Sequence, residues 1–150
     1  MEIVITTGKD ERFVELCHSL DSYLNYIVGG EKQREQYKKY NMLEDIQDVV
    51  LVIQEEQAIG CGSFKEYTPN VAEIKRVFVR SDSRCLGVGK LIVEALEKLA
   101  YEKRYKKLIL ETGAPLVEAM RLYSSLGYNV AENYGQYKDM PESICMEKVL

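Results

Sequence analysis

Residues 71–100 read VAEIKRVFVRSDSRCLGVGKLIVEALEKLA, and this stretch decides the fold. Its first part, 71–80, is rich in β-branched and aromatic side chains, which favour a strand. From Val88 onward, apolar residues recur at the spacing of a helix with one buried face, at Leu91, Ile92, Ala95, Leu96, Leu99 and Ala100. The stretch therefore predicts a strand, a loop containing Gly87 and Gly89, and then a helix.

The flanking sequence extends this alternation in both directions. Apolar patterning predicts a helix from Phe13 to Ile27, ended by Gly29-Gly30, and another over 116–126. A second, more exposed helix is expected within 31–43, which carries Tyr37 and Tyr40. Further strands are predicted over 1–6, 48–54, 58–67, 107–112, 128–131 and 143–149. We expect one α/β domain over residues 1–150, with a mixed sheet in which the strands of 48–80 form an antiparallel meander.

Composition and charge exclude several classes of function. Hydrophobic residues make up 46% of the 150 residues and charged residues 29%, which is too apolar for a disordered chain. The net charge of −4 argues against a nucleic-acid partner. No apolar run is long enough to cross a membrane, and the N-terminus lacks a secretory signal, so we expect a cytoplasmic protein with no membrane partner. No metal site is expected, because the only histidine is His18 and the cysteines are scattered, at Cys17, Cys61, Cys85 and Cys145.

The loop with two glycines is a candidate anion site. A glycine turn that opens a helix directs free backbone N–H groups and the positive end of the helix dipole to one place. Two other phosphate-binding motifs are excluded, because a dinucleotide fingerprint requires glycine at Ile92 and a P-loop requires glycine at Arg84. The alternative is that Gly87 and Gly89 only tighten the turn.

The remaining pattern, Arg84-x-x-Gly87-x-Gly89 at the start of a helix, resembles the acyl-CoA pyrophosphate loop of the GNAT superfamily of N-acyltransferases. The resemblance extends to the segment LYSSLGY at 122–128 and to the order of elements over nearly the whole chain. It is similar to a branch of small, single-domain bacterial members. The resemblance implies a mostly antiparallel sheet of six to seven strands, with a splayed central strand pair and helices on both faces.

The resemblance also implies acetyl-CoA as co-substrate. Its pantetheine arm would pair with the backbone of the splayed strand at Val77, Phe78 and Val79. The pyrophosphate would lie on the loop formed by Arg84, Cys85, Leu86, Gly87, Val88, Gly89 and Lys90. Arg84 would add a charge-assisted contact, and the alternative for Arg84 is a solvated loop arginine.

Two residues are candidates for the chemistry. A carboxylate within an interior strand costs free energy unless it has a task or a partner, which singles out Glu73 as general base. One alternative is that Glu73 only forms a salt bridge with Lys75. The other is that Glu111 is the base. Tyr123 matches the family's tyrosine near the acyl-CoA sulfur, as general acid or hydrogen-bond donor to the thiolate, and otherwise packs in the core. Many members carry Asn where this chain has Leu116.

The acceptor side is expected around Glu111, Tyr134 and Tyr137, because aromatic walls suit a cationic amine. For the earlier tyrosines, which include Tyr23 and Tyr26, we favour packing between helices. The expected activity is transfer of the acetyl group to a primary amine of a small molecule or an exposed protein amine, directly in a ternary complex. The alternative is a non-catalytic acyl-CoA-binding module. Small members of the family are often dimers, so a homodimer is a further expectation.

Overall fold

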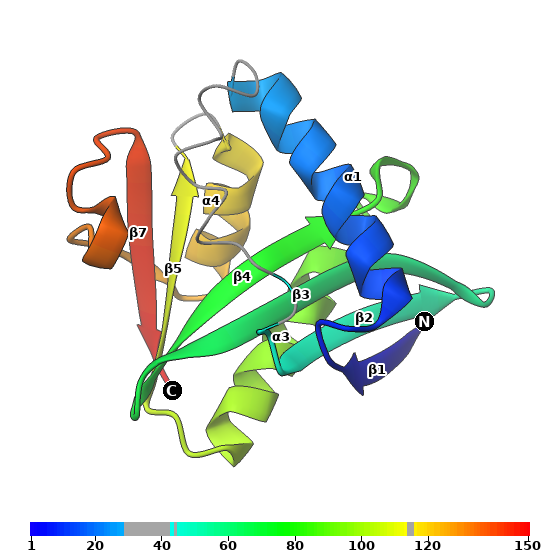
Figure 1. Ribbon diagram of the computed structural model, residues 1–150, viewed down its shortest axis with the longest axis horizontal. Coiled ribbons are helices and arrows are strands. Elements are labelled where there is room, and N and C mark those ends of the chain that lie inside the picture. The colour runs from blue at the N-terminus through cyan, green and yellow to red at the C-terminus, as the bar shows by residue number, and fades with distance from the viewer. Residues whose placement is uncertain (29–42, 44, 114–115) are drawn as a thin grey trace.

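A seven-stranded sheet forms the centre of the computed structural model, which describes residues 1–28, 43, 45–113 and 116–150. The strands are β1 (Glu2–Thr6), β2 (Asp48–Gln54), β3 (Gln57–Thr68), β4 (Val71–Val79), β5 (Lys107–Gly113), β6 (Asn129–Ala131) and β7 (Ser143–Val149). They lie in the order β1-β2-β3-β4-β5-β7-β6 (Figure 1). Among the strand pairs of the described residues, only β4–β5 is parallel. The predicted meander and the mixed, mostly antiparallel sheet are confirmed.

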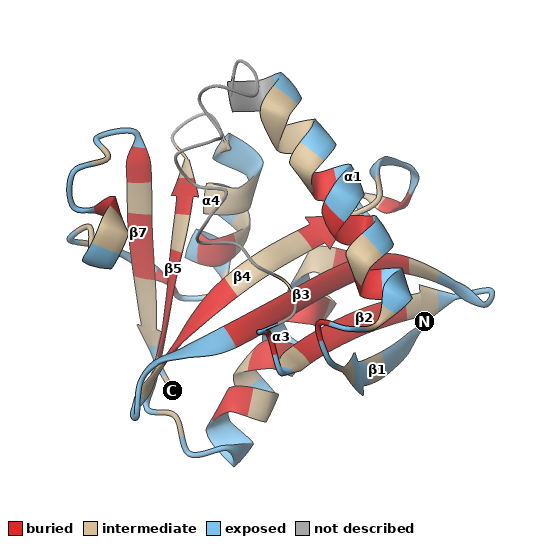
Figure 2. Ribbon diagram, viewed as in Figure 1, coloured by how far each residue is buried: buried red, intermediate tan, exposed pale blue. Residues whose placement is uncertain are grey.

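Helices cover both faces of this sheet, as predicted. They are α1 (Glu11–Val28), α3 (Val88–Glu102) and α4 (Val117–Ser125), with single 3₁₀ turns at Ser81–Ser83 and Gly135–Tyr137. Alternate residues of β2 enter two separate cores: Val49 and Leu51 pack with α1, whereas Val50 and Val52 pack with α3. Figure 2 shows the burial concentrated in the middle of the sheet. The helix expected within 31–43 and the Gly29-Gly30 pair expected to end the first helix lie outside the described residues, apart from residue 43.

The central parallel pair is splayed. Residues Val71–Glu73 of β4 pair with Lys107–Ile109 of β5, and no further pairs join these two strands in the described chain. β5 instead pairs along its whole length with β7. From Ile74 onward, the side of β4 that faces β5 therefore opens onto a gap, and the expected splay is confirmed.

A β-bulge in β4 lies beside this gap. Cys61 is opposite Phe78 and Ser63 is opposite Lys75, so β4 contains one extra residue at this point. Arg76 has a φ of 59°, a left-handed conformation that disfavours any residue with a side chain. Three contacts hold the bulge. The Cys61 thiol donates to the Arg76 carbonyl (3.3 Å), the Ser63 hydroxyl donates to the Lys75 carbonyl (2.6 Å), and Arg76 Nη1 lies 2.6 Å from Asp21 Oδ1 of α1. Because a bulge bends its strand, it directs β4 away from β5.

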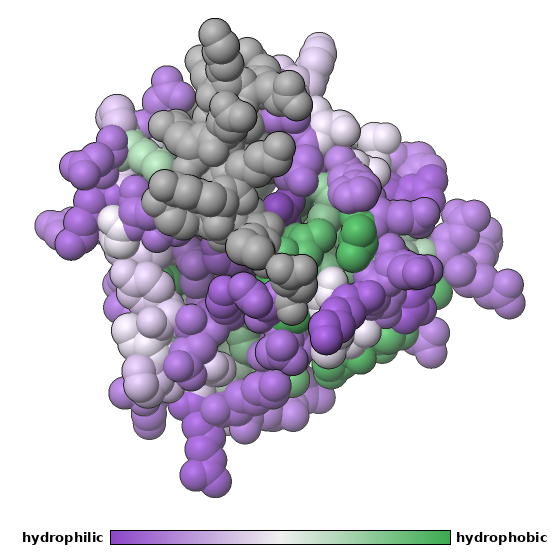
Figure 3. All heavy atoms as spheres, viewed as in Figure 1, coloured by the Kyte–Doolittle hydropathy of each residue, from purple (hydrophilic) through white to green (hydrophobic). Residues whose placement is uncertain are grey.

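Figure 3 shows a largely hydrophilic face, with apolar side chains gathered over the β1 edge of the sheet, where Ile3 and Ile5 are exposed. Within the described part of the chain, none of the helices combines the length and the apolar character needed to cross a membrane. The same residues contain no cluster of three or more histidine, cysteine or acidic side chains able to hold a metal ion.

Removal of the Ser63 hydroxyl is the most direct test of what holds the bulge. Replacing Ser63 with alanine takes a hydrogen bond away from a buried carbonyl, so we expect Ser63→Ala to lower the free energy of unfolding by about 1–3 kcal/mol. Ser19→Ala is the matched control, because the Ser19 hydroxyl makes an exposed 3.4 Å contact with the Glu15 carbonyl. Urea denaturation of both variants measures the difference. Equal stability of the two variants would remove Ser63 from this role.

Candidate active site

Two adjoining cavities occupy the gap between β4 and β5. The larger, of about 580 Å³, is bounded by the end of β4, the glycine loop and α4. The smaller, of about 160 Å³, lies between β4, β5 and the segment before β7. Six residues line both cavities, and they are Leu20, Leu24, Val77, Leu116, Ala119 and Tyr123. The shared wall makes the two cavities one cleft with two ends.

The glycine loop lies at one end of this cleft. Gly87 precedes the first residue of α3 with a φ of 79°, which favours glycine, although an added Cβ would meet no atom within 4 Å. A Cβ at Gly89 would lie 3.1 Å from Leu122. The Val88 side chain is buried in the core and anchors the loop, whereas Leu86 is exposed and does not line the larger cavity. The first amides of α3 therefore face the cavity without a capping side chain.

Arg84 is attached to the wall of the larger cavity. Its Nε donates to the Val79 carbonyl at 3.1 Å, and its guanidinium carbon lies 4.7 Å from the ring centroid of Tyr23 and 5.7 Å from that of Phe78. These are cation–π distances. Arg84 is thus held in place beside the loop, in contrast with the alternative of a solvated arginine.

Glu73 lies at the other end of the cleft and is only 7% exposed. Its Oε1 is 3.5 Å from Lys75 Nζ, so the salt bridge that was the alternative to a catalytic role is present. Its Oε2 accepts a hydrogen bond of 2.5 Å from the Tyr134 hydroxyl. Both carboxylate oxygens therefore have a donor, which compensates for the loss of water around a buried charge.

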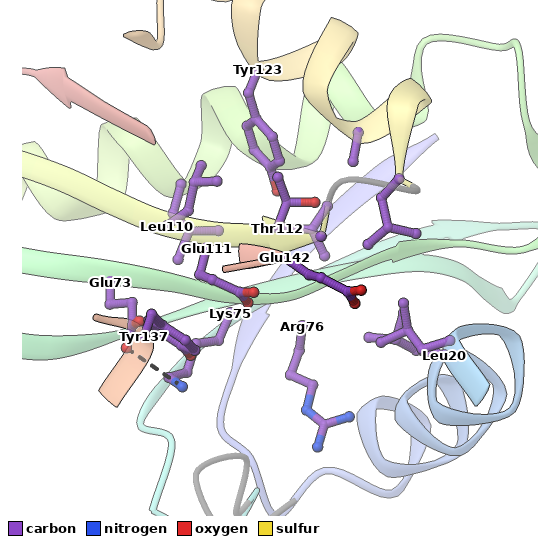
Figure 4. Close-up of a pocket in the computed structure, with 16 residues that line it drawn as sticks. Leu20, Glu73, Lys75, Arg76, Leu110, Glu111, Thr112, Tyr123, Tyr137 and Glu142 are labelled. Carbon is purple, nitrogen blue, oxygen red and sulfur yellow. Dashed lines mark ion pairs between the residues drawn. The ribbon is translucent and has the colours of Figure 1, made fainter. Parts of the chain in front are cut away.

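Glu111 and Tyr137 line the same smaller cavity as Glu73 (Figure 4). Burial raises the pKa of the Tyr137 hydroxyl, and the negative charges of Glu73 and Glu111 raise it further. Tyr137 is therefore a neutral hydrogen-bonding group between two carboxylates. Tyr134, which we also expected on the acceptor wall, lines neither cavity, and its hydroxyl reaches Glu73 from the β6–β7 loop.

Tyr123 projects from α4 into the region where the cavities meet (Figure 4). Its ring packs edge-on against Tyr128, with centroids 5.5 Å apart, and is 6% exposed. Desolvation raises the pKa of its hydroxyl, so Tyr123 is protonated at neutral pH. The residue is thus both a core tyrosine and a donor at the junction of the cleft.

Several cleft residues were not predicted. Leu20, Tyr23 and Leu24 of α1 line the cleft, although the helical pattern indicates only packing. Glu142 lines the smaller cavity from the segment before β7. A helical period predicts which face of α1 is apolar, but does not indicate that part of that face borders a gap. Glu142 has no signal in the sequence beyond its position near the predicted last strand.

Sequence comparison identifies the family. A sequence profile described as the acetyltransferase (GNAT) family matches residues 13–128. The chain belongs to this family. The expected family is therefore confirmed, and the splayed pair with its glycine loop is the GNAT arrangement that the resemblance implied.

Relatives of this GNAT chain come from several organisms. It is 29% identical to an IAA acetyltransferase of Azospirillum brasilense over 145 residues, 91% of this chain and 90% of that protein. It is 32% identical over 97 residues to YsnE of Bacillus subtilis, an uncharacterized N-acetyltransferase, over 63% of this chain. The chain spans 64% of the length of YsnE and 55% of a Schizosaccharomyces pombe relative.

Solved structures show the same fold. A Klebsiella pneumoniae protein assigned to the acyl-CoA N-acyltransferases superposes with a TM-score of 0.82 at 25% identity, over 99% of this GNAT chain and 97% of that one. The PaiA N-acetyltransferase of Thermoplasma acidophilum, in complex with coenzyme A, superposes with a TM-score of 0.75 at 20% identity, over the whole of both chains.

Thiol reactivity provides a test of the loop geometry in this GNAT domain. Cys85 is exposed, whereas Cys17, Cys61 and Cys145 are buried, and burial also raises the pKa of Cys145. With Ellman's reagent we expect one fast-reacting thiol in the native protein, lost in Cys85→Ser and retained in Cys145→Ser. A second fast thiol in the native protein would contradict this arrangement.

Proposed function

We propose that this protein is an acetyl-CoA-dependent N-acetyltransferase that acetylates a primary amine of a small molecule or an exposed protein amine. The observation that carries the proposal is the single cleft with two unlike ends. One end has a backbone loop suited to phosphates, the other has a buried carboxylate, and Tyr123 and Val77 lie where the ends meet. A transferase with two substrates needs two such sites that share a reaction point.

The residues of the larger cavity fit the co-substrate. The start of α3 offers free N–H groups and a positive dipole end, which suit a pyrophosphate. Arg84 and Lys90 add positive charge on the same wall. Beyond Glu73, the side of β4 facing the gap lacks a strand partner over the described residues, so the backbone of Val77 is available to an extended pantetheine arm. The Val79 carbonyl already accepts from Arg84 Nε and has only its second lone pair to offer.

The chemistry requires an amine that has lost a proton. An ammonium has no lone pair, so Glu73 would first take one proton, and the neutral amine nitrogen then attacks the thioester carbonyl. The carbon–sulfur bond breaks and its electron pair leaves with sulfur as the thiolate of CoA. The nitrogen gives up its second proton to that thiolate, which yields free CoA. The product is an amide, and no acyl-enzyme intermediate is needed.

Tyr123 would assist the departing sulfur. Its hydroxyl lies at the junction of the cavities and is protonated because burial raises its pKa. A tyrosine with a raised pKa is a weaker acid than a thiol. A hydrogen bond from Tyr123 to the developing thiolate is therefore more favourable than complete proton transfer. Of the two roles that the family resemblance implies, general acid and hydrogen-bond donor, this favours the donor.

A second candidate function is a non-catalytic acyl-CoA-binding module. It is favoured by Leu116, which lines both cavities where many members of the family carry asparagine, and by the engagement of both Glu73 oxygens.

A cytoplasmic location agrees with the four free thiols. Light scattering, which measures the molar mass in solution, tests the homodimer expected from the resemblance.

Incubation with acetyl-CoA and a panel of diamines, amino acids and peptides separates the two functions. We expect at least one amine to yield an acetylated product, detected by mass spectrometry because thiol reagents would also label Cys85. Calorimetric binding of acetyl-CoA without product from any amine would support the module. Absence of both binding and product would remove both proposals.

Replacement of the base gives the sharper test. We expect Glu73→Gln to lower kcat by about 100-fold, because general-base catalysis is worth roughly 10²–10⁴. The affinity for acetyl-CoA should stay within about twofold, because Glu73 does not line the larger cavity. Glu66→Gln is the matched control, since Glu66 also accepts a hydrogen bond from a tyrosine, Tyr105, but lies outside the cleft. A wild-type kcat in Glu73→Gln would transfer the role to another group, with Glu111 the next candidate.

A further inference from the structure

The β6–β7 loop, residues 132–142, is held by one side-chain amide and by backbone hydrogen bonds. Asn133 Nδ2 lies 3.1–3.2 Å from the carbonyl oxygens of Tyr137, Met140 and Ser143, so its two N–H groups are shared among three acceptors. Successive backbone hydrogen bonds run from Tyr137 to Tyr134, from Met140 to Tyr137 and from Ser143 to Met140. The segment is therefore a rigid connection tied to the start of β7.

Two other tyrosine rings hold the ring of Tyr134 from two sides. Tyr67 from the end of β3 and Tyr137 from the loop both pack edge-on against it, with centroids 5.2 and 5.4 Å away. Gly135 has a φ of 52°, and a Cβ there would lie 3.2 Å from the Tyr67 hydroxyl oxygen. Glycine at this position thus permits both the backbone conformation and the close approach of Tyr67.

The hydroxyl of this fixed ring ends on the Glu73 carboxylate. It donates to Oε2 at 2.5 Å, while Lys75 faces Oε1 at 3.5 Å. Burial raises the pKa of Tyr134, and the charge of Glu73 and their hydrogen bond raise it further, so Tyr134 is the donor. Tyr134 lines neither cavity, and it therefore supports Glu73 from outside the space that an acceptor would occupy.

We propose that Tyr134 is a positioning residue that holds the Glu73 carboxylate oriented towards the smaller cavity. This inference rests on the proposed function, in which Glu73 is the base. A donor that is itself held by packing limits the rotation of the carboxylate to which it bonds. The β6–β7 loop is thus part of the catalytic apparatus without contacting either substrate.

Other charged and titratable side chains also act on the Glu73 carboxylate, and they are the same with and without the Tyr134 hydroxyl. The charged and titratable side chains near Glu73 come from its own strand, from β3, β5 and β7, and from the loop, and they are Lys75, Lys65, Glu111, Cys145, Tyr134 and Tyr137. Lys65 is opposite Glu73 in register, but its ammonium lies 4.0 Å from Asp45. Removal of the Tyr134 hydroxyl alone leaves these groups in place.

The test is the variant Tyr134→Phe, which keeps the ring between Tyr67 and Tyr137 and removes only the donor. Tyr105→Phe is the matched control, because it removes a tyrosine–glutamate hydrogen bond, to Glu66, away from the cleft. The carboxyl carbons of glutamate-labelled protein are followed by NMR at one neutral pH, with the Glu73 signal assigned from Glu73→Gln. In Tyr134→Phe we expect the chemical shift of the Glu73 carboxyl carbon to change, because the carboxylate loses its Tyr134 donor. In Tyr105→Phe, the Glu66 signal should move and the Glu73 signal should not.

Kinetics supply the second readout. We expect Tyr134→Phe to lower kcat about tenfold at neutral pH, with the KM for acetyl-CoA unchanged. In a Glu73→Gln background the same change should have no further effect, because both act through one carboxylate.

An unchanged Glu73 carboxyl signal in Tyr134→Phe would overturn the inference, as would a full additional loss in the double variant. The proposed function fails by different results, namely an absence of acetylated product or a wild-type kcat in Glu73→Gln. The NMR comparison needs no turnover, so it judges the role of Tyr134 on Glu73 apart from those results.

Discussion

The site depends on the early separation of two parallel strands. β4 and β5 pair over only three residues, and the bulge at Arg76 then bends β4 away. A strand edge inside a protein normally finds a partner, because unpaired backbone groups are costly to bury. Here β5 pairs with β7 instead, and β4 keeps an edge that faces a cleft. The left-handed Arg76 is tolerated because donors from β3 and an ion pair to α1 support the bulge.

The separation also creates two different electrostatic environments along one cleft. The loop end presents backbone N–H groups and arginine, which suit phosphate, although the whole protein carries a net charge of −4. The other end contains the buried Glu73 and the half-buried Glu111, near tyrosines whose pKa is raised. A site that attracts phosphate and a site that attracts a cationic amine can therefore be neighbours. The first uses peptide dipoles, and the second uses the charges of side chains.

The local elements were predictable because their patterns are local. β2 and β7 have the predicted bounds, and α3 begins at Val88 as the apolar spacing indicates. Glu73 could be singled out because a carboxylate within an apolar strand is unusual. The partner of that carboxylate could not be found in this way. Tyr134 lies 61 positions away in sequence, and its ring is directed by Tyr67 and by Asn133, which no short pattern connects.

Local patterns predict the order of strands and helices, the glycine loop before α3 and the family resemblance, because all three depend on neighbouring residues. Three features appear only in the folded chain: β7 inserts between β5 and β6, Arg84 is held on Tyr23, and Tyr134 contacts Glu73 from outside the cavity. These are contacts between distant segments. Their geometry follows from how the bulged sheet packs against α1 and the β6–β7 loop, and side-chain periodicity carries no information about it.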